Sequence, residues 1–175
     1  MARFAGADAW IEQYFLNSPD DEREEFTSAE LEDLARTHRA LAEIRAPKTS
    51  VVAARNDDYN TTLYVATDDM PHIVSSLTAY LSAHFGGFLA IFHPIFLAER
   101  NTDGKLISLR GTGTRANLAS GDTAAVGMPS LQLSEGAPEG STVTIESWIA
   151  IRLTRYLNED DLRLLEHDVR RVLAD

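Results

Sequence analysis

The chain has 175 residues, about the length of one domain with a substantial core, and its 44% hydrophobic and 25% charged composition is that of a globular protein. Its 27 acidic and 16 basic residues give a formal net charge of −11, which argues against nucleic acid and anionic membrane surfaces as partners. The absence of cysteine excludes disulfides, thiol catalysis and thiolate metal sites. Neither a signal peptide nor an apolar run long enough to cross a membrane is recognisable, so we expect a cytoplasmic protein.

Residues 1–47 predict two helices. The stretch "DAWIEQYFLNSP" has apolar residues at helical spacing and ends before a proline. A second helix begins with a T-x-x-E capping box formed by Thr27 and Glu30, keeps its apolar residues on one face and ends at Pro47. His38 lies on that apolar face, so we expect a buried, hydrogen-bonded histidine; a ligand or a proton shuttle is the alternative.

A hairpin and a helix follow. Residues 50–55 and 61–67 have extended patterns and flank "NDDYN", whose asparagine and aspartate residues favour turns. They therefore predict two antiparallel strands. An amphipathic helix over 71–85 comes next, and Gly86-Gly87 ends it.

The remaining elements are three strands and a helix. Residues 88–99 are apolar on both faces and predict a covered strand, which an Asp-Gly turn connects to a strand over 104–110. Residues 143–153 alternate between apolar and polar side chains, as strands do. Asn158 then caps a helix over 158–174 that begins with three acidic residues.

The order of these elements predicts an α+β domain with a ferredoxin-like fold that lacks its last strand. The hairpin strand at 50–55 takes the place of the missing strand. The predicted sheet order is 50–55, 61–67, 143–153, 88–99, 104–110. Both helices of the unit cover one face, and the other face is left for a partner or for the N-terminal helices.

The domain organisation follows from the same pattern. Residues 1–47 form a helical lead-in, and residues 48–175 form the α+β domain. Within it, residues 111–141 are rich in glycine, serine, threonine, alanine and proline without a period, which predicts a long flexible insertion.

The segment Asp68-Asp69-Met70-Pro71 raises a choice between chemistry and structure. As a strand-to-helix turn, one aspartate would cap the helix and Pro71 would take its first position. As chemistry, paired carboxylates could act as acid and base or bind a divalent cation, but no nucleophile or second acidic cluster is recognisable nearby. We therefore expect a turn and no catalytic residues.

A metal site is not expected either. The three histidines of the central region do not show the i, i+4 pairing of helical zinc sites, so a surface or capping role is expected for each of them: His72, His84 and His93.

Several motifs together resemble one family. The stretch "TDDMPHIVSSLTAYLSAHFG", then "LAIFHPIF", "DGKL" and "ESWIAI", resembles the N-terminal ACT-like segment of the large bacterial NAD-specific glutamate dehydrogenases. Upstream, "YFLNSPDDE" and "LARTHRALAEIR" are similar to the helical lead-in of that segment, so the resemblance covers most of residues 13–153. Two departures are the insertion, which is longer than expected, and the absence of a G-x-G-x-x-G motif after a strand.

The resemblance implies an ACT-like fold and a regulatory and assembly module of a larger enzyme. NAD would be the cofactor of that parent enzyme, with no cofactor or metal in this chain, and the partners would be the rest of the dehydrogenase and a second copy of the module. The rival interpretation is an independent ACT-type amino-acid sensor that acts on a separate protein. The resemblance also implies an amino-acid effector site between the first strand's loop and the helix, with two glycines opposite it if a partner domain contributes; a capped turn that binds nothing is the alternative. The candidate residues are Asp68, Asp69, Met70, Pro71, His72, Gly86 and Gly87.

Overall fold

The computed structural model describes residues 9–112 and 132–175. Its N-terminal part holds three helices: α1 (Ala9–Phe15), α2 (Asp20–Glu24) and α3 (Ser28–Leu41). The predicted capping box starts α3: Glu30 N–H donates to the Thr27 hydroxyl, and the Glu30 carboxylate accepts from Thr27 N–H. The short helix α2 lies in the acidic stretch between the two helices predicted from the sequence.

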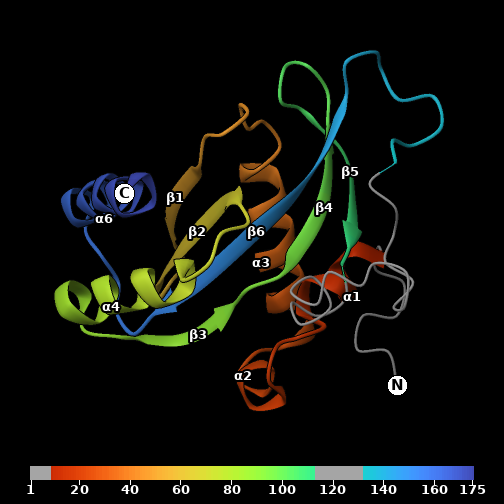
Figure 1. Ribbon diagram of the computed structural model, residues 1–175. Coiled ribbons are helices and arrows are strands. Elements are labelled where there is room, and N and C mark those ends of the chain that lie inside the picture. The colour runs from red at the N-terminus through yellow and green to blue at the C-terminus, as the bar shows by residue number, and fades with distance from the viewer. Residues whose placement is uncertain (1–8, 113–131) are drawn as a thin grey trace.

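The strands form one antiparallel sheet, shown in Figure 1. The strands are β1 (Val51–Asn56), β2 (Thr61–Asp68), β3 (Phe88–Phe92), β4 (Ile95–Arg100), β5 (Leu106–Gly111) and β6 (Thr142–Leu153). The sheet order is β1-β2-β6-β4-β5, and β3 also pairs with β6. This order confirms the ferredoxin-like arrangement predicted from the sequence, including the hairpin strand β1 at the edge.

One predicted strand is wrong in detail. The apolar stretch 88–99 forms two strands, β3 and β4, that pair in turn with the long strand β6. The interruption falls at His93 and Pro94, because a proline has no N–H to donate to a ladder. The Pro94 carbonyl still accepts a hydrogen bond from Trp148 N–H at 3.0 Å, so the segment between β3 and β4 stays attached to β6.

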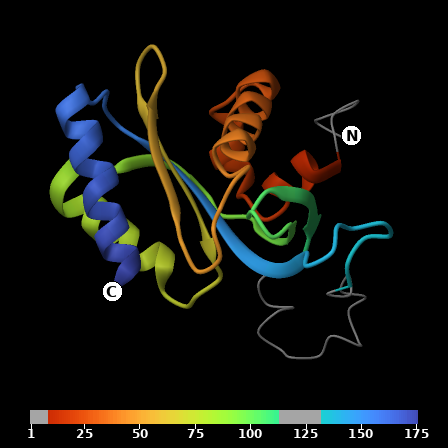
Figure 2. The same cartoon turned by 90° about the horizontal axis from the view of Figure 1, so that it is seen from above.

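Helices cover both faces of the sheet, as Figure 2 shows from above. The helices α4 (Ile73–Phe85) and α6 (Glu159–Ala174) lie on one face, and α1 and α3 lie on the other. Asn158 caps α6 by accepting from Asp161 N–H at 2.9 Å, as predicted. The N-terminal helices thus occupy the face that the sequence left open to them or to a partner.

Two apolar cores result from this layering. The first, between the sheet and α1–α3, includes Tyr14, Phe92 and Trp148. The second, between the sheet and α4 and α6, includes Leu63, Leu77 and Leu165. Alternate residues of β2 and β6 contribute to opposite cores, as the period of a strand requires.

Side chains of α6 cover the outer edge of β1. The Glu166 carboxylate accepts from Ala54 N–H at 2.9 Å, and Arg170 donates to the carbonyl of Val52 at 2.8 Å. Backbone groups of an edge strand that are engaged in this way do not offer a template for another strand.

The predicted insertion 111–141 is described only in part, because residues 113–131 lie outside the described residues. The described end of this segment is attached to the sheet. Ser134 donates from both its N–H and its hydroxyl to the Glu99 carboxylate, and Arg110 donates to the Gln132 carbonyl.

Across residues 9–112 and 132–175, no helix combines the length and the apolar character that a membrane span requires.

Candidate functional site

The β2–α4 loop, residues 68–72, joins the sheet to the helical layer. Asp68 ends β2 and lies opposite Glu146 of β6 in the strand register. Two carboxylates in such a pair would repel each other, but a cation lies between them. Arg45 Nη2 is 2.7 Å from the Asp68 carboxylate and 2.8 Å from the Glu146 carboxylate. The Asp68 side chain is 45% exposed, whereas that of Glu146 is fully buried.

Glu146 accepts hydrogen bonds from four side chains: Arg45, Arg100, Trp148 and Thr144, whose hydroxyl lies 3.5 Å from Oε1. Arg45 donates to Oε1 from Nε at 3.2 Å and from Nη2 at 2.8 Å. Arg100 donates to Oε1 at 2.7 Å and to Oε2 at 3.1 Å, and the Trp148 indole N–H donates to Oε2 at 3.0 Å. Burial by itself would raise the pKa of Glu146, but the hydrogen bonds and charges of the two arginines hold that pKa below its ordinary value. We name Arg45, Asp68, Arg100 and Glu146 the Glu146 cluster.

The Glu146 cluster anchors the end of α3 to the sheet. Arg100 donates to the backbone carbonyls of Ala42, Glu43 and Gly104, so its buried guanidinium is bonded to the α3–β1 connection and to the β4–β5 turn. A buried charge needs this kind of pairing, because an unpaired one costs several kcal/mol. The arrangement therefore fixes three segments that are distant in sequence.

Asp69 is held by the neighbouring residue of β6. Its Oδ1 accepts from the Ser147 hydroxyl at 2.6 Å, and its N–H donates to the Ile145 carbonyl at 3.0 Å. The expectation that Asp68 or Asp69 caps the helix is therefore wrong. Both carboxylates are instead bonded to β6 or its partners, Asp68 to Arg45 and Asp69 to Ser147.

The helix α4 begins without a side-chain cap. The N-cap residue is His72, which has a left-handed backbone with a φ of 64°, and its side chain makes no capping hydrogen bond. Pro71 consequently precedes the cap and does not take the first helical position. Met70 packs partly buried against the second core, while Pro71 and His72 are exposed.

The two glycines of the candidate site lie at the other end of α4. Gly86 is its C-cap with a φ of 85°, and Gly87 follows with a φ of 121°. A helix of 13 residues is about 20 Å long, since each residue adds 1.5 Å. The structure therefore brings Asp68, Asp69 and Met70 together but does not bring Gly86 and Gly87 to them within one chain.

The central histidines differ in environment. His72 is exposed, His84 is exposed and bonds through Nδ1 to the Tyr80 carbonyl at 2.9 Å, and His93 is half-buried. Among the residues that the structure describes, no three His, Cys, Asp or Glu side chains are grouped so that they could hold a metal ion.

His38 is a buried core histidine, as predicted. Its Nδ1 lies 2.6 Å from the Tyr14 hydroxyl and its Nε2 lies 2.9 Å from the Val65 carbonyl. Because a carbonyl can only accept, Nε2 carries the proton and Nδ1 accepts from Tyr14. Burial lowers the pKa of His38 to about 3, against the opposing effect of the Val65 carbonyl, so the ring is neutral.

The Glu146 cluster was missed at the level of sequence. In the sequence, Glu146-Ser147-Trp148 served only as part of a family resemblance. In the structure, Ser147 donates to Asp69, the Trp148 indole donates to Glu146, and the Trp148 and His38 ring centres are 4.9 Å apart. A glutamate in the middle of a strand with an apolar alternation is the one signal that could have indicated a buried ion pair.

Comparison with known proteins adds the family. No solved structure matches the chain. The family model described as the glutamate dehydrogenase ACT1 domain matches residues 10–169, a range that covers nearly all of α1, the sheet, α4 and most of α6. Because this match covers nearly the whole chain and the fold is the ACT-like one, the chain belongs to the family of glutamate dehydrogenase ACT1 domains.

Proposed function

We propose that this chain is a non-catalytic regulatory and assembly module of a large NAD-dependent glutamate dehydrogenase of the bacterial type. The observation that carries the proposal is the family match over residues 10–169. Glu146 supports it, because its carboxylate is fully buried and bonded to Arg45 and Arg100 of the same domain, as expected for a structural rather than a catalytic group.

The proposal places NAD and glutamate in another part of the parent enzyme. Its first test uses the purified chain with NAD and glutamate, and follows the formation of NADH. No turnover and no NAD binding are expected. Steady turnover by the purified chain would refute a non-catalytic module.

Assembly is tested on the same preparation. Light scattering after size-exclusion chromatography measures the mass of the chain over a wide range of concentration. We expect self-association. A monomer at the highest attainable concentration, together with unchanged assembly of the parent dehydrogenase after deletion of this domain, would remove the assembly role.

We further propose that an amino-acid effector binds at the β2–α4 loop of this module. The half-exposed Asp68 carboxylate supports this, because it could receive an ammonium group. The N-terminus of α4, which no side chain caps, could receive the effector's carboxylate on its backbone N–H groups. Gly86 and Gly87 would have to come from a second copy, given their distance along α4.

The effector is sought with a panel of amino acids at millimolar concentration. An amino acid that binds only the folded chain raises its melting temperature. Asp68→Asn should abolish that rise, and Asp160→Asn, which changes a highly exposed aspartate of α6, should keep it. If both variants respond like the parent chain, the effector does not use Asp68.

A further inference from the structure

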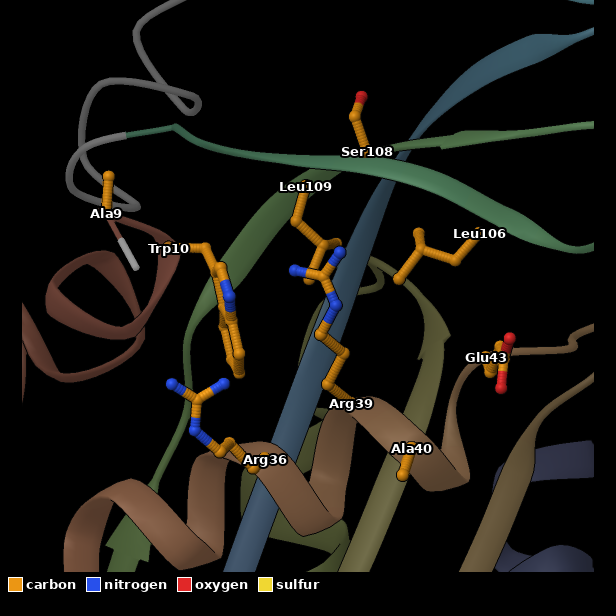
Figure 3. A pocket seen from close by; sticks show the side chains of 9 residues that line it. All are labelled: Ala9, Trp10, Arg36, Arg39, Ala40, Glu43, Leu106, Ser108 and Leu109. Atoms are coloured by element: carbon orange, nitrogen blue, oxygen red, sulfur yellow. The ribbon is translucent and has the colours of Figure 1, made fainter. Parts of the chain in front are cut away.

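A cavity of about 730 Å³ lies on the side of the sheet opposite α4. Figure 3 shows its walls: Trp10 from α1, Arg36 and Arg39 from α3, and Leu106 and Leu109 from β5. Its volume is within the range of small-molecule sites in proteins, and its walls come from three elements that pack on the same core. It shares no residue with the β2–α4 loop.

The cavity brings two positive charges together in a chain whose net charge is −11. Arg36 and Arg39 are three residues apart on α3, so they lie on the same helical face, where like charges repel. Both side chains are directed toward the indole of Trp10 in Figure 3, and the Arg39 guanidinium carbon is 4.9 Å from the ring centre. The pairing of Arg36 with Glu32 is solvent-exposed and contributes little energy.

The remaining lining includes one acidic side chain, Glu43, which is largely exposed and lies 3.9 Å from Lys105; the rest supplies surface for a flat organic body. Trp10, Leu106 and Leu109 are half-buried and supply apolar surface beside the two charges. Ser108 adds a hydroxyl group. Guanidinium groups match carboxylate and phosphate oxygens in shape and charge, and aromatic rings bind other flat groups through their faces and edges.

We propose that this cavity binds a small aromatic anion, whose carboxylate or phosphate contacts Arg36 and Arg39 and whose ring packs against Trp10 and the leucines of β5. The inference goes beyond the proposed function, since it concerns binding alone. If the assembly experiment or the effector experiment fails, the proposed anion site is unaffected. If the anion site fails its own test, the proposed assembly and effector roles are unaffected.

Trp10 provides the readout. The chain has two tryptophans, and Trp148 is fully buried, so a ligand in the cavity should change the fluorescence of Trp10 alone. The probes are AMP and benzoate, each paired with an uncharged analogue, adenosine and benzamide. We expect saturable quenching by at least one anion and at least tenfold weaker binding of its analogue. A response to AMP identifies a phosphate site, and a response to benzoate identifies a carboxylate site.

Substitutions then locate the binding. Arg36→Gln combined with Arg39→Gln should weaken the anion at least tenfold, whereas Arg163→Gln, which removes an exposed charge from α6, should not. In case the double variant folds poorly, added salt on the parent chain gives an independent test, because screening weakens exposed charge pairs. No quenching by either anion, equal binding of the uncharged analogues, or binding that neither salt nor the double substitution weakens would overturn the proposal.

Discussion

The substitution Glu146→Gln should destabilise the domain far more than Asp68→Asn, which changes the exposed charge of the Glu146 cluster. Glutamine keeps the shape of the side chain but removes the charge that balances Arg45 and Arg100. It also places an amide N–H₂ against the donors that now bond to the two carboxylate oxygens. Removing one partner of a buried ion pair costs about 3–5 kcal/mol, a large part of the roughly 5–15 kcal/mol that stabilises a typical domain.

Urea denaturation measures this cost. The midpoint should fall while the slope of the transition stays the same, and the melting temperature should drop by roughly 6–20 °C for a chain of this size. Asp68→Asn is the control, because Asp68 is 45% exposed, bonds to the same Arg45 and should cost less than about 1 kcal/mol. A Glu146→Gln chain within about 1 kcal/mol of the parent would refute the role given to the cluster.

The stability that Glu146 contributes should depend on pH. The pKa of Glu146 in the folded chain lies below its ordinary value of 4.5, so the folded state favours the charged form. The stability that this shift contributes is fully present above pH 4.5 and is lost as the pH falls through the folded-state pKa. Glu146→Gln should therefore flatten the loss of stability below pH 4.5, and an unchanged acid profile would contradict the assignment.

Other predictions concern the backbone and His38. His38 has a folded-state pKa of about 3, below its ordinary 6.5, so the unfolded chain binds the extra proton and stability should fall from pH 6.5 toward pH 3. His38→Gln should lose that slope, as followed by urea midpoints at several pH values. His72 has a left-handed backbone with a φ of 64°. His72→Val should therefore be less stable than His72→Gly by about 1–2 kcal/mol, because a branched side chain strains this conformation. Gly104→Ala should be far more damaging than Gly86→Ala in thermal unfolding, because its added Cβ would overlap the Arg45 carbonyl, whereas a Cβ added at Gly86 would meet nothing within 4 Å beyond its chain neighbours.

Local signals predicted the elements of this fold because they act within a few residues. The capping box at Thr27 and the Asn158 cap depend on groups three residues away, and both form as predicted. The alternation of 143–153 identified a strand for the same reason, since successive side chains of a strand point to opposite faces of the sheet. The sheet order followed from connection rules that hold for most folds of this kind.

The partners of Asp68 and Asp69 could not be predicted from local signals. Asp68 and Asp69 have the local features of a helix cap, and their sequence neighbours support one. Which partner a carboxylate takes depends on every donor within reach, and those donors come from residues far away in the sequence. The register of β2 against β6 placed Asp68 beside Glu146, and only a third segment could supply the arginine that separates them.

The sequence by itself determined the class, most of the elements, their order in the sheet and the family resemblance, since composition, periodicity and short motifs act locally or through general rules of connection. The tertiary structure alone decided the partners of Asp68 and Asp69 and the contact of Trp10 with Arg39 of α3. Each of these depends on contacts between segments separated by tens of residues. A local pattern carries no information about such contacts, because burial, register and competing donors are fixed only when the layers pack.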